Sequence, residues 1–132
     1  MLLDTSGLLS FLDDSDAHHA RATQLFGTAG VRLTHSYVLA ELVPLCRVRR
    51  LSRTKTLAFA ATIIDNEDVE IVWVDKRLHR AAVALLKARP DKDYSLCDAV
   101  SFILMRRRSI TEALTTDSHF EREGFVRLLK IQ

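Results

Sequence analysis

Short apolar segments alternate along the chain with longer segments of helical periodicity, and this alternation constrains the fold most. Segments typical of strands are residues 1–4, 31–35, 70–75, 112–116 and 126–130. Apolar residues recur at helical spacing in residues 7–13, 17–26, 36–50, 54–64, 76–87 and 95–107. Such alternation predicts a mostly parallel sheet with helices on both faces. We therefore expect an α/β fold of three layers with a central sheet of about five strands.

Length and composition fit one globular domain over residues 1–132. Hydrophobic residues make up 48% of the chain and charged residues 27%, and 2 prolines and 4 glycines leave no room for a linker. Cys46 and Cys97 lie in apolar helical segments, which indicates core packing in a reducing compartment rather than a disulfide or a zinc site. No signal segment precedes the first strand, and no apolar run approaches the roughly 20 residues of a membrane span. We expect a cytoplasmic protein.

The charge of the chain is clustered rather than large. A net charge of +2 does not by itself predict a nucleic-acid partner. Two arginine-rich clusters are nevertheless suited to a phosphate backbone, and their candidate contact residues are Arg47, Arg50, Arg106 and Arg107. An ordinary solvated surface has the same composition, so both interpretations stay open.

Asp98 is a carboxylate in a helix that is otherwise almost entirely apolar. Burying an ionised carboxylate without a partner is costly in free energy. Ser95 and Asp98 have the spacing of a capping box, which alone would stabilise the helix by roughly 0.5–2 kcal/mol. The residue is therefore either a helix cap or part of a site.

Three further carboxylates share this ambiguity. Asp4 ends the first strand and Asp117 directly follows the fourth, so both open onto the edge of the sheet where ligands bind in such folds. Glu41 is flanked by apolar residues in the third helical segment. Each has a structural alternative: a helix N-cap for Asp4, an exposed helical position for Glu41 and a turn for Asp117.

Convergence of the four carboxylates would require a cation or protonation. At about 5–6 Å each ionised pair repels by roughly 3 kcal/mol at an effective dielectric constant near 20. Oxygen ligands without a cysteine or histidine set favour Mg²⁺ or Mn²⁺, which serve phosphoryl chemistry by activating water. Small hydroxyl residues beside the acids are suited to orienting them or to capping helices: Thr5, Ser6, Ser36 and Thr116.

Four segments together resemble one known family. They are LLDTSGLLSFLD at 2–13, AEL at 40–42, YSLCDAVSF at 94–102 and ALTTDSHFEREGF at 113–125. This set is similar to PIN-domain ribonucleases, most of all to the VapC-type toxins of prokaryotic toxin–antitoxin pairs. The resemblance spans nearly the whole chain, and the last two segments are its most specific part.

The resemblance implies a function and a set of site residues. Asp4, Glu41, Asp98 and Asp117 would form the acidic metal-binding quartet of an endoribonuclease that uses Mg²⁺ or Mn²⁺, with Asp4 and Asp98 the firmest ligands. It also implies an RNA substrate, a homodimer and an antitoxin that occupies the active-site groove. In the family pattern His119 serves packing or local hydrogen bonding, and we expect Asp93 to face solvent.

Two alternatives compete with a nuclease. A non-catalytic RNA-binding or antitoxin-binding module of the same fold would bind RNA without metal and without the acids. A receiver-like signalling domain would use Mg²⁺ with Asp75 as phosphoacceptor and Lys130 nearby. The receiver interpretation lacks the paired acids expected after the first strand, because Asp4 is followed by Thr5.

Overall fold

The structure is a computed structural model that describes residues 1–130. One parallel sheet has the strand order β3-β2-β1-β4-β5. Its strands are β1 (Leu2–Leu3), β2 (Leu33–His35), β3 (Glu70–Val72), β4 (Glu112–Leu114) and β5 (Val126–Arg127). The helices of the described part are α1 (Thr5–Leu12), α2 (His19–Thr28), α3 (Ser36–Val48), α4 (Arg53–Thr62), the 3₁₀ turn η1 (Ile63–Asp65), α5 (Lys76–Ala88), α6 (Leu96–Arg107) and α7 (His119–Arg122).

The expected α/β fold is confirmed, with every strand pair parallel. All five strand segments and all six helical segments lie where the sequence periodicity predicts them, although each strand is shorter than expected. Helix α7 was not expected, because four residues are too few to show a periodicity. The strand order also differs from the 2-1-3-4-5 order of receiver domains. The receiver interpretation is therefore wrong.

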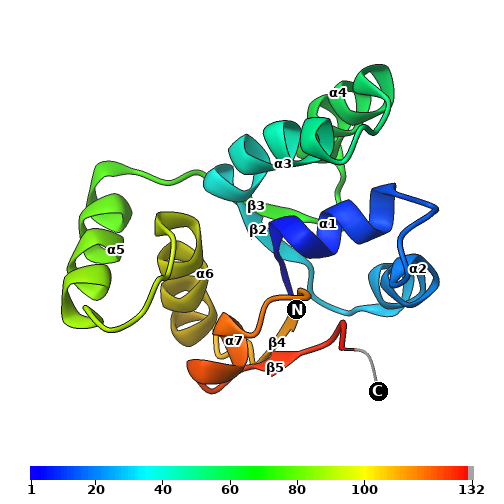
Figure 1. The fold of residues 1–132 in the computed structure, drawn as a ribbon. Coiled ribbons are helices and arrows are strands. Elements are labelled where there is room, and N and C mark those ends of the chain that lie inside the picture. Colours follow the sequence, from blue (N-terminus) through cyan, green and yellow to red (C-terminus); the bar gives the residue numbers. More distant parts are fainter. Residues whose placement is uncertain (131–132) are drawn as a thin grey trace.

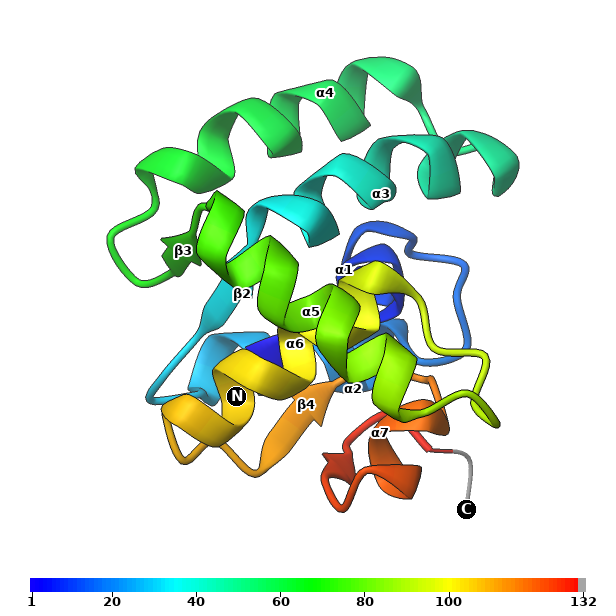
Figure 2. The same ribbon diagram turned by 90° about the vertical axis from the view of Figure 1, so that its left-hand side faces the viewer.

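Alternating side chains of the central strands divide the core into two parts. Leu3 and Leu114 face one core, and their neighbours Leu2 and Ala113 face the other. Helices α1 to α4 cover the first face, and α5 and α6 cover the second (Figure 1). Figure 2 shows α5 crossing the outer side of α6. Cys46 and Cys97 are free and buried in the first core, as their apolar surroundings predict.

Gly7 lets α1 pack directly against the end of β4. A Cβ atom at this position would lie 1.9 Å from the carbonyl oxygen of Leu114, so no larger residue fits without displacing the helix. The backbone N–H of Asp4 donates to the same carbonyl at 3.2 Å. This close approach places Asp4 beside the residues that follow β4. Within residues 1–130 no helix is long and apolar enough to cross a bilayer.

Candidate active site

The four carboxylates singled out from the sequence line one groove at the carboxyl edge of the sheet. Asp4 follows β1, Glu41 projects from α3, Asp98 lies in the first turn of α6, and Asp117 lies between β4 and α7. The groove has a volume of about 500 Å³. Its other lining residues are Thr5, Ser6, Pro44, Leu45, Val48, Asp93, Ser95 and His119. One wall is thus acidic, and the wall from the second half of α3 is apolar.

Asp4 is buried as part of the groove rather than used as a cap. Only 5% of the residue is exposed, and its side chain makes no capping hydrogen bond to α1. Its Oδ2 accepts hydrogen bonds from the Thr115 hydroxyl at 2.7 Å and the Ser6 hydroxyl at 3.2 Å. Burial raises the pKa of Asp4 to about 7; the Thr115 hydroxyl opposes this shift, and the charges of Asp98 and Asp117 add to it.

Asp98 caps α6, as its spacing from Ser95 predicts, and it also lines the groove. It forms a capping box with Ser95: its backbone N–H donates to Ser95 Oγ and its Oδ2 accepts from the Ser95 N–H, each at 3.0 Å. The same Oδ2 lies 3.1 Å from Nδ1 of His119. Burial raises the pKa of Asp98 even though the Ser95 N–H favours the ionised form. The cap therefore holds a buried carboxylate at the groove.

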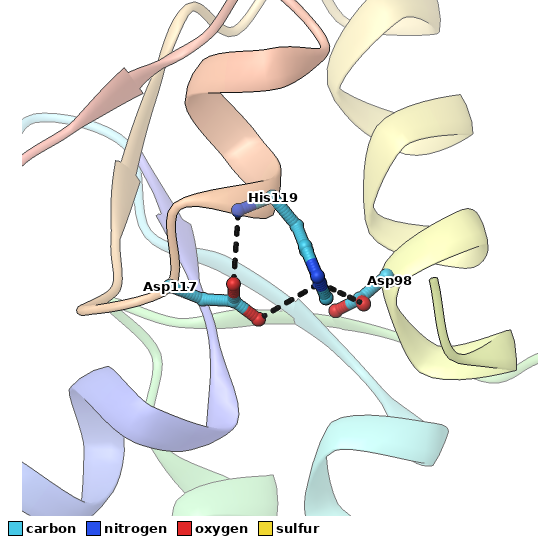
Figure 3. Close-up of side chains that lie close together, drawn as sticks. All are labelled: Asp98, Asp117 and His119. Carbon is cyan, nitrogen blue, oxygen red and sulfur yellow. Dashed lines mark hydrogen bonds and ion pairs between the residues drawn. The ribbon is translucent and has the colours of Figure 1, made fainter. Parts of the chain in front are cut away.

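His119 lies between the acids of the groove (Figure 3). Its Nδ1 is 3.3 Å from Oδ2 of Asp117, and its backbone N–H donates to Oδ1 of the same residue at 2.9 Å. Its Nε2 is 3.0 Å from Oδ1 of Asp93. Burial alone would lower the pKa of His119, but Asp98, Asp117 and Asp93 outweigh it and raise that pKa. The local hydrogen bonding expected of His119 is present, and it joins three carboxylates.

Asp93 faces solvent, as we expected, but it also contacts His119. Its side chain is 84% exposed, and its Oδ1 lies 3.0 Å from Nε2 of the histidine. No sequence pattern predicts this contact, because it depends on how α7 packs against the start of α6.

Glu41 is exposed, as its structural alternative predicted, but it lines the groove. Burial nevertheless raises its pKa, opposed by the Cys97 thiol and helped by Asp98.

The four candidate hydroxyl residues have different surroundings. Ser6 bonds Asp4, and its Oγ accepts from the backbone N–H of Thr116 at 3.0 Å. The Thr5 hydroxyl lies 4.0 Å from the sulfur of Cys97. Ser36 instead accepts from the backbone N–H of Val74 at 2.9 Å, and it is not among the described residues that line the groove.

Thr115, rather than Thr116, supplies the hydroxyl that bonds Asp4. Leu3 of β1 pairs with Leu114 of β4, so the next residues along the two strands, Asp4 and Thr115, are neighbours. Among residues 1–130 the Thr116 hydroxyl makes no hydrogen bond, and this residue contributes through its backbone. The register of β1 with β4 determines which of the two threonines bonds Asp4, and the sequence pattern alone does not predict that register.

None of the four candidate arginines is among the described residues that line the groove. Arg106 lies about eight residues along α6 from Asp98, which is roughly 12 Å of helix. Its Nη2 is 3.2 Å from Oε1 of Glu123. Its guanidinium carbon lies 5.3 Å from the centre of the Phe125 ring. Arg107 lines a separate hollow with Trp73. Arg47 and Arg50 are exposed and lie close in sequence to Val48, which lines the groove, but they themselves line two other hollows.

The donor set of the groove fits a hard divalent cation. Asp4, Glu41 and Asp98 all have raised pKa values, with burial as the main cause and neighbouring carboxylates adding to it. Oxygen donors whose negative charge is destabilised by burial and mutual repulsion are the groups that Mg²⁺ or Mn²⁺ would stabilise. Donor atoms of Asp98, Asp117 and His119 lie within 4.8 Å of one another. One ion can reach all three.

Comparison with known proteins finds matches that cover nearly the whole chain. The family model of the PIN domain matches residues 1–126. The chain belongs to the PIN domain family. This PIN domain is similar to the 23S rRNA-specific endonuclease VapC20 of Mycobacterium tuberculosis, in strains CDC 1551 / Oshkosh and ATCC 25618 / H37Rv. The identity is 32% over 127 residues, which is 96% of this chain and 95% of VapC20.

A solved structure agrees with this assignment of the PIN domain. The crystal structure of Mycobacterium tuberculosis VapC20, a Sarcin-Ricin loop cleaving toxin, matches with a TM-score of 0.86 and 32% identity over 95% of both chains. The resemblance to PIN-domain ribonucleases of the VapC type, indicated by four sequence segments, is thereby confirmed.

Proposed function

We propose that this PIN domain is a divalent-metal-dependent endoribonuclease and the toxin of a toxin–antitoxin pair. The observation that carries the proposal is the gathering of four carboxylates from β1, α3, α6 and the β4–α7 connection around one groove. The 32% identity to an rRNA endonuclease over nearly the full length of both chains supports it. RNA is the substrate class, and the sarcin–ricin loop of 23S rRNA is the first substrate to test.

In the proposed reaction, some residues of the groove would bind the metal ion and others would orient the metal-binding carboxylates. Asp4, Glu41, Asp98 and Asp117 would hold Mg²⁺ or Mn²⁺. A bound ion supplies an activated water and stabilises the charge of the leaving oxygen. Ser6 and Thr115 hold one oxygen of Asp4 and thus fix the orientation of that carboxylate. The capping box fixes Asp98 in the same way.

Surfaces beside the groove suit the substrate and the antitoxin. Arg47 and Arg50 are exposed at the end of α3, near Val48 of the apolar wall, where they would contact phosphates of an RNA strand that extends beyond the groove. Val48 on that wall is 77% exposed, and the wall with Pro44 and Leu45 suits an apolar segment of an inhibitory antitoxin. We further propose a homodimer and a cytoplasmic location, where ribosomal RNA is accessible.

A cleavage assay with matched acid variants tests the proposal. A synthetic sarcin–ricin hairpin is incubated with the protein plus Mn²⁺ or with a chelator. Wild type should cut it only with metal, and Asp4→Asn and Asp98→Asn should be at least a hundredfold slower. Asp75→Asn is the control, because Asp75 also follows a strand but caps α5 by accepting from the Leu78 N–H at 2.8 Å.

Other outcomes of this assay separate the two functional classes. Wild-type rates in the Asp4→Asn or Asp98→Asn variant would rule out the metal-dependent mechanism. RNA binding that persists in the chelator and in both acid variants, without cleavage, would identify a non-catalytic RNA-binding module.

A further inference from the structure

We propose that His119 is itself part of the metal site. Its Nδ1 would bind the ion beside the carboxylates of Asp98 and Asp117, and Asp93 would hold its ring from the opposite side. This inference rests on the proposed metal-dependent function and adds a nitrogen ligand to a site otherwise made of oxygen. It also sets which metal the site prefers.

The distances around Nδ1 match those between ligands of one ion. Nδ1 lies 3.1 Å from Oδ2 of Asp98 and 3.3 Å from Oδ2 of Asp117. Adjacent ligands of an octahedral ion with bonds of about 2.1 Å are separated by about 3 Å. Both distances from Nδ1 are therefore those of adjacent ligands, and the donor atoms of all three residues lie within 4.8 Å of one another (Figure 3).

Asp93 gives His119 the support that metal-binding histidines have. Such a histidine almost always donates its second ring N–H to a carboxylate or carbonyl, which fixes the tautomer and leaves the other nitrogen for the metal. Here Nε2 lies 3.0 Å from Oδ1 of Asp93, while Nδ1 faces Asp98 and Asp117. Arg122 Nη1 is 3.9 Å from the same oxygen.

The ring of His119 is also held in place by its neighbours. It packs edge-on against the Tyr94 ring, with 5.1 Å between the ring centres and 69° between the planes. Its backbone N–H donates to Asp117, so the histidine and that acid keep one relative position. Only 17% of the side chain is exposed. The imidazole is thus directed at the groove before any ion binds.

A nitrogen ligand has a consequence for metal choice. Imidazole suits first-row transition ions, whereas Mg²⁺ prefers an all-oxygen set. The site should therefore bind Mn²⁺ more tightly than Mg²⁺, and the difference should depend on His119.

The test measures coordination directly, without RNA. Mn²⁺-loaded protein is examined by pulsed electron paramagnetic resonance for ¹⁴N coupling, with histidine-selective ¹⁵N labelling to assign the signal. Wild type should show imidazole coupling that ¹⁵N labelling alters, and His119→Gln should lose it. Titration calorimetry with the metals alone should show Mn²⁺ affinity reduced at least tenfold in His119→Gln. Mg²⁺ affinity should change less than about threefold, because Mg²⁺ prefers oxygen ligands.

Two further variants complete the design. His18→Gln is the matched control, since His18 lies at the start of α2 outside the groove, and it should behave as wild type. Asp93→Ala should weaken Mn²⁺ binding roughly tenfold while keeping the ¹⁴N coupling, because the ring remains but loses its support.

Three results would overturn the inference. If bound Mn²⁺ shows no histidine coupling in wild type, His119 is not a ligand; this measurement does not require any variant to fold. Unchanged Mn²⁺ affinity in His119→Gln, combined with lost affinity in Asp98→Asn, would reject the histidine and keep the proposed nuclease site. Unchanged Mn²⁺ affinity in Asp98→Asn as well, or no Mn²⁺ binding to wild type, would reject the metal site itself.

Discussion

The Thr115 hydroxyl donates a 2.7 Å hydrogen bond to Oδ2 of Asp4, between the ends of two paired strands. This bond crosses from β4 to β1 at the point where both strands open onto the groove. It favours the ionised form of a carboxylate whose burial favours the neutral form. In the proposed metal site, the availability of Asp4 as a ligand would therefore depend on a threonine 111 residues away in the sequence.

Replacing Thr115 with valine should reduce both the Mn²⁺ affinity and the melting temperature of the protein. Loss of a hydrogen bond to a buried charged group costs roughly 1.5–3 kcal/mol. We expect a lower melting temperature and a Mn²⁺ affinity reduced about tenfold, because the neutral form of Asp4 becomes more favoured. Thr116→Val is the control, since among residues 1–130 that hydroxyl makes no hydrogen bond. Equal effects of the two variants on Mn²⁺ affinity would contradict this role of Thr115.

Replacing Asp4 with asparagine should stabilise the metal-free protein at alkaline pH. The raised pKa of about 7 means that the folded protein binds a proton between pH 3.8 and 7 that the unfolded chain releases. Stability is therefore lost as the pH rises through this window, and asparagine avoids that loss. The melting temperature of Asp4→Asn should exceed that of wild type by several degrees at pH 8, and the difference should vanish near pH 4. Mn²⁺ should raise the melting temperature of wild type alone.

His35 should give the opposite pH dependence. This fully buried residue bonds Ser101 at 2.8 Å and accepts from the Val38 N–H, and burial lowers its pKa from 6.5 to about 4. The unfolded chain thus binds a proton between pH 6.5 and 4 that the folded protein excludes, so stability falls as the pH falls. Urea unfolding from pH 7 to pH 4 should compare Asp4→Asn with the double variant that also carries His35→Asn. The double variant should lose about 3 kcal/mol less of its unfolding free energy over this range, because the contribution of His35 is removed.

Gly7 should tolerate no side chain. Because its Cβ would lie 1.9 Å from the Leu114 carbonyl oxygen, Gly7→Ala must displace α1 from β4. We expect destabilisation of several kcal/mol and loss of cleavage, since Asp4 moves with the first turn of α1. Gly27→Ala in α2 provides a contrast, because a Cβ atom at that position would meet nothing within 4 Å. This substitution should stabilise α2 by about 0.5–1 kcal/mol. A Gly7→Ala variant as stable as wild type would show that this close approach is not required.

The sequence predicts the fold and the four acids because both depend on local patterns. Alternating periodicities define the layers, and the strand-end rule brings Asp4 and Asp117 to one edge. The support of the site depends on tertiary geometry instead. Thr115 is selected by the register of β1 with β4, and Asp93 reaches His119 only through the packing of α7. Arg106 carries the charge expected of an RNA contact, but α6 directs it to Glu123 at the other end of the helix.

Because Asp98 also forms a capping box, an acid at this position does not by itself indicate that a related chain is catalytically active. A descendant that abandoned catalysis would still need residue 98 to start α6, whereas Asp4 would be released from an unfavourable burial. In a chain that has lost catalytic activity, we therefore expect Asp4 or the exposed Glu41 to be substituted before Asp98. Among relatives of this PIN domain, helix capping alone would then explain an acid at the start of this helix, and the acid after the first strand should be the better marker of catalytic activity.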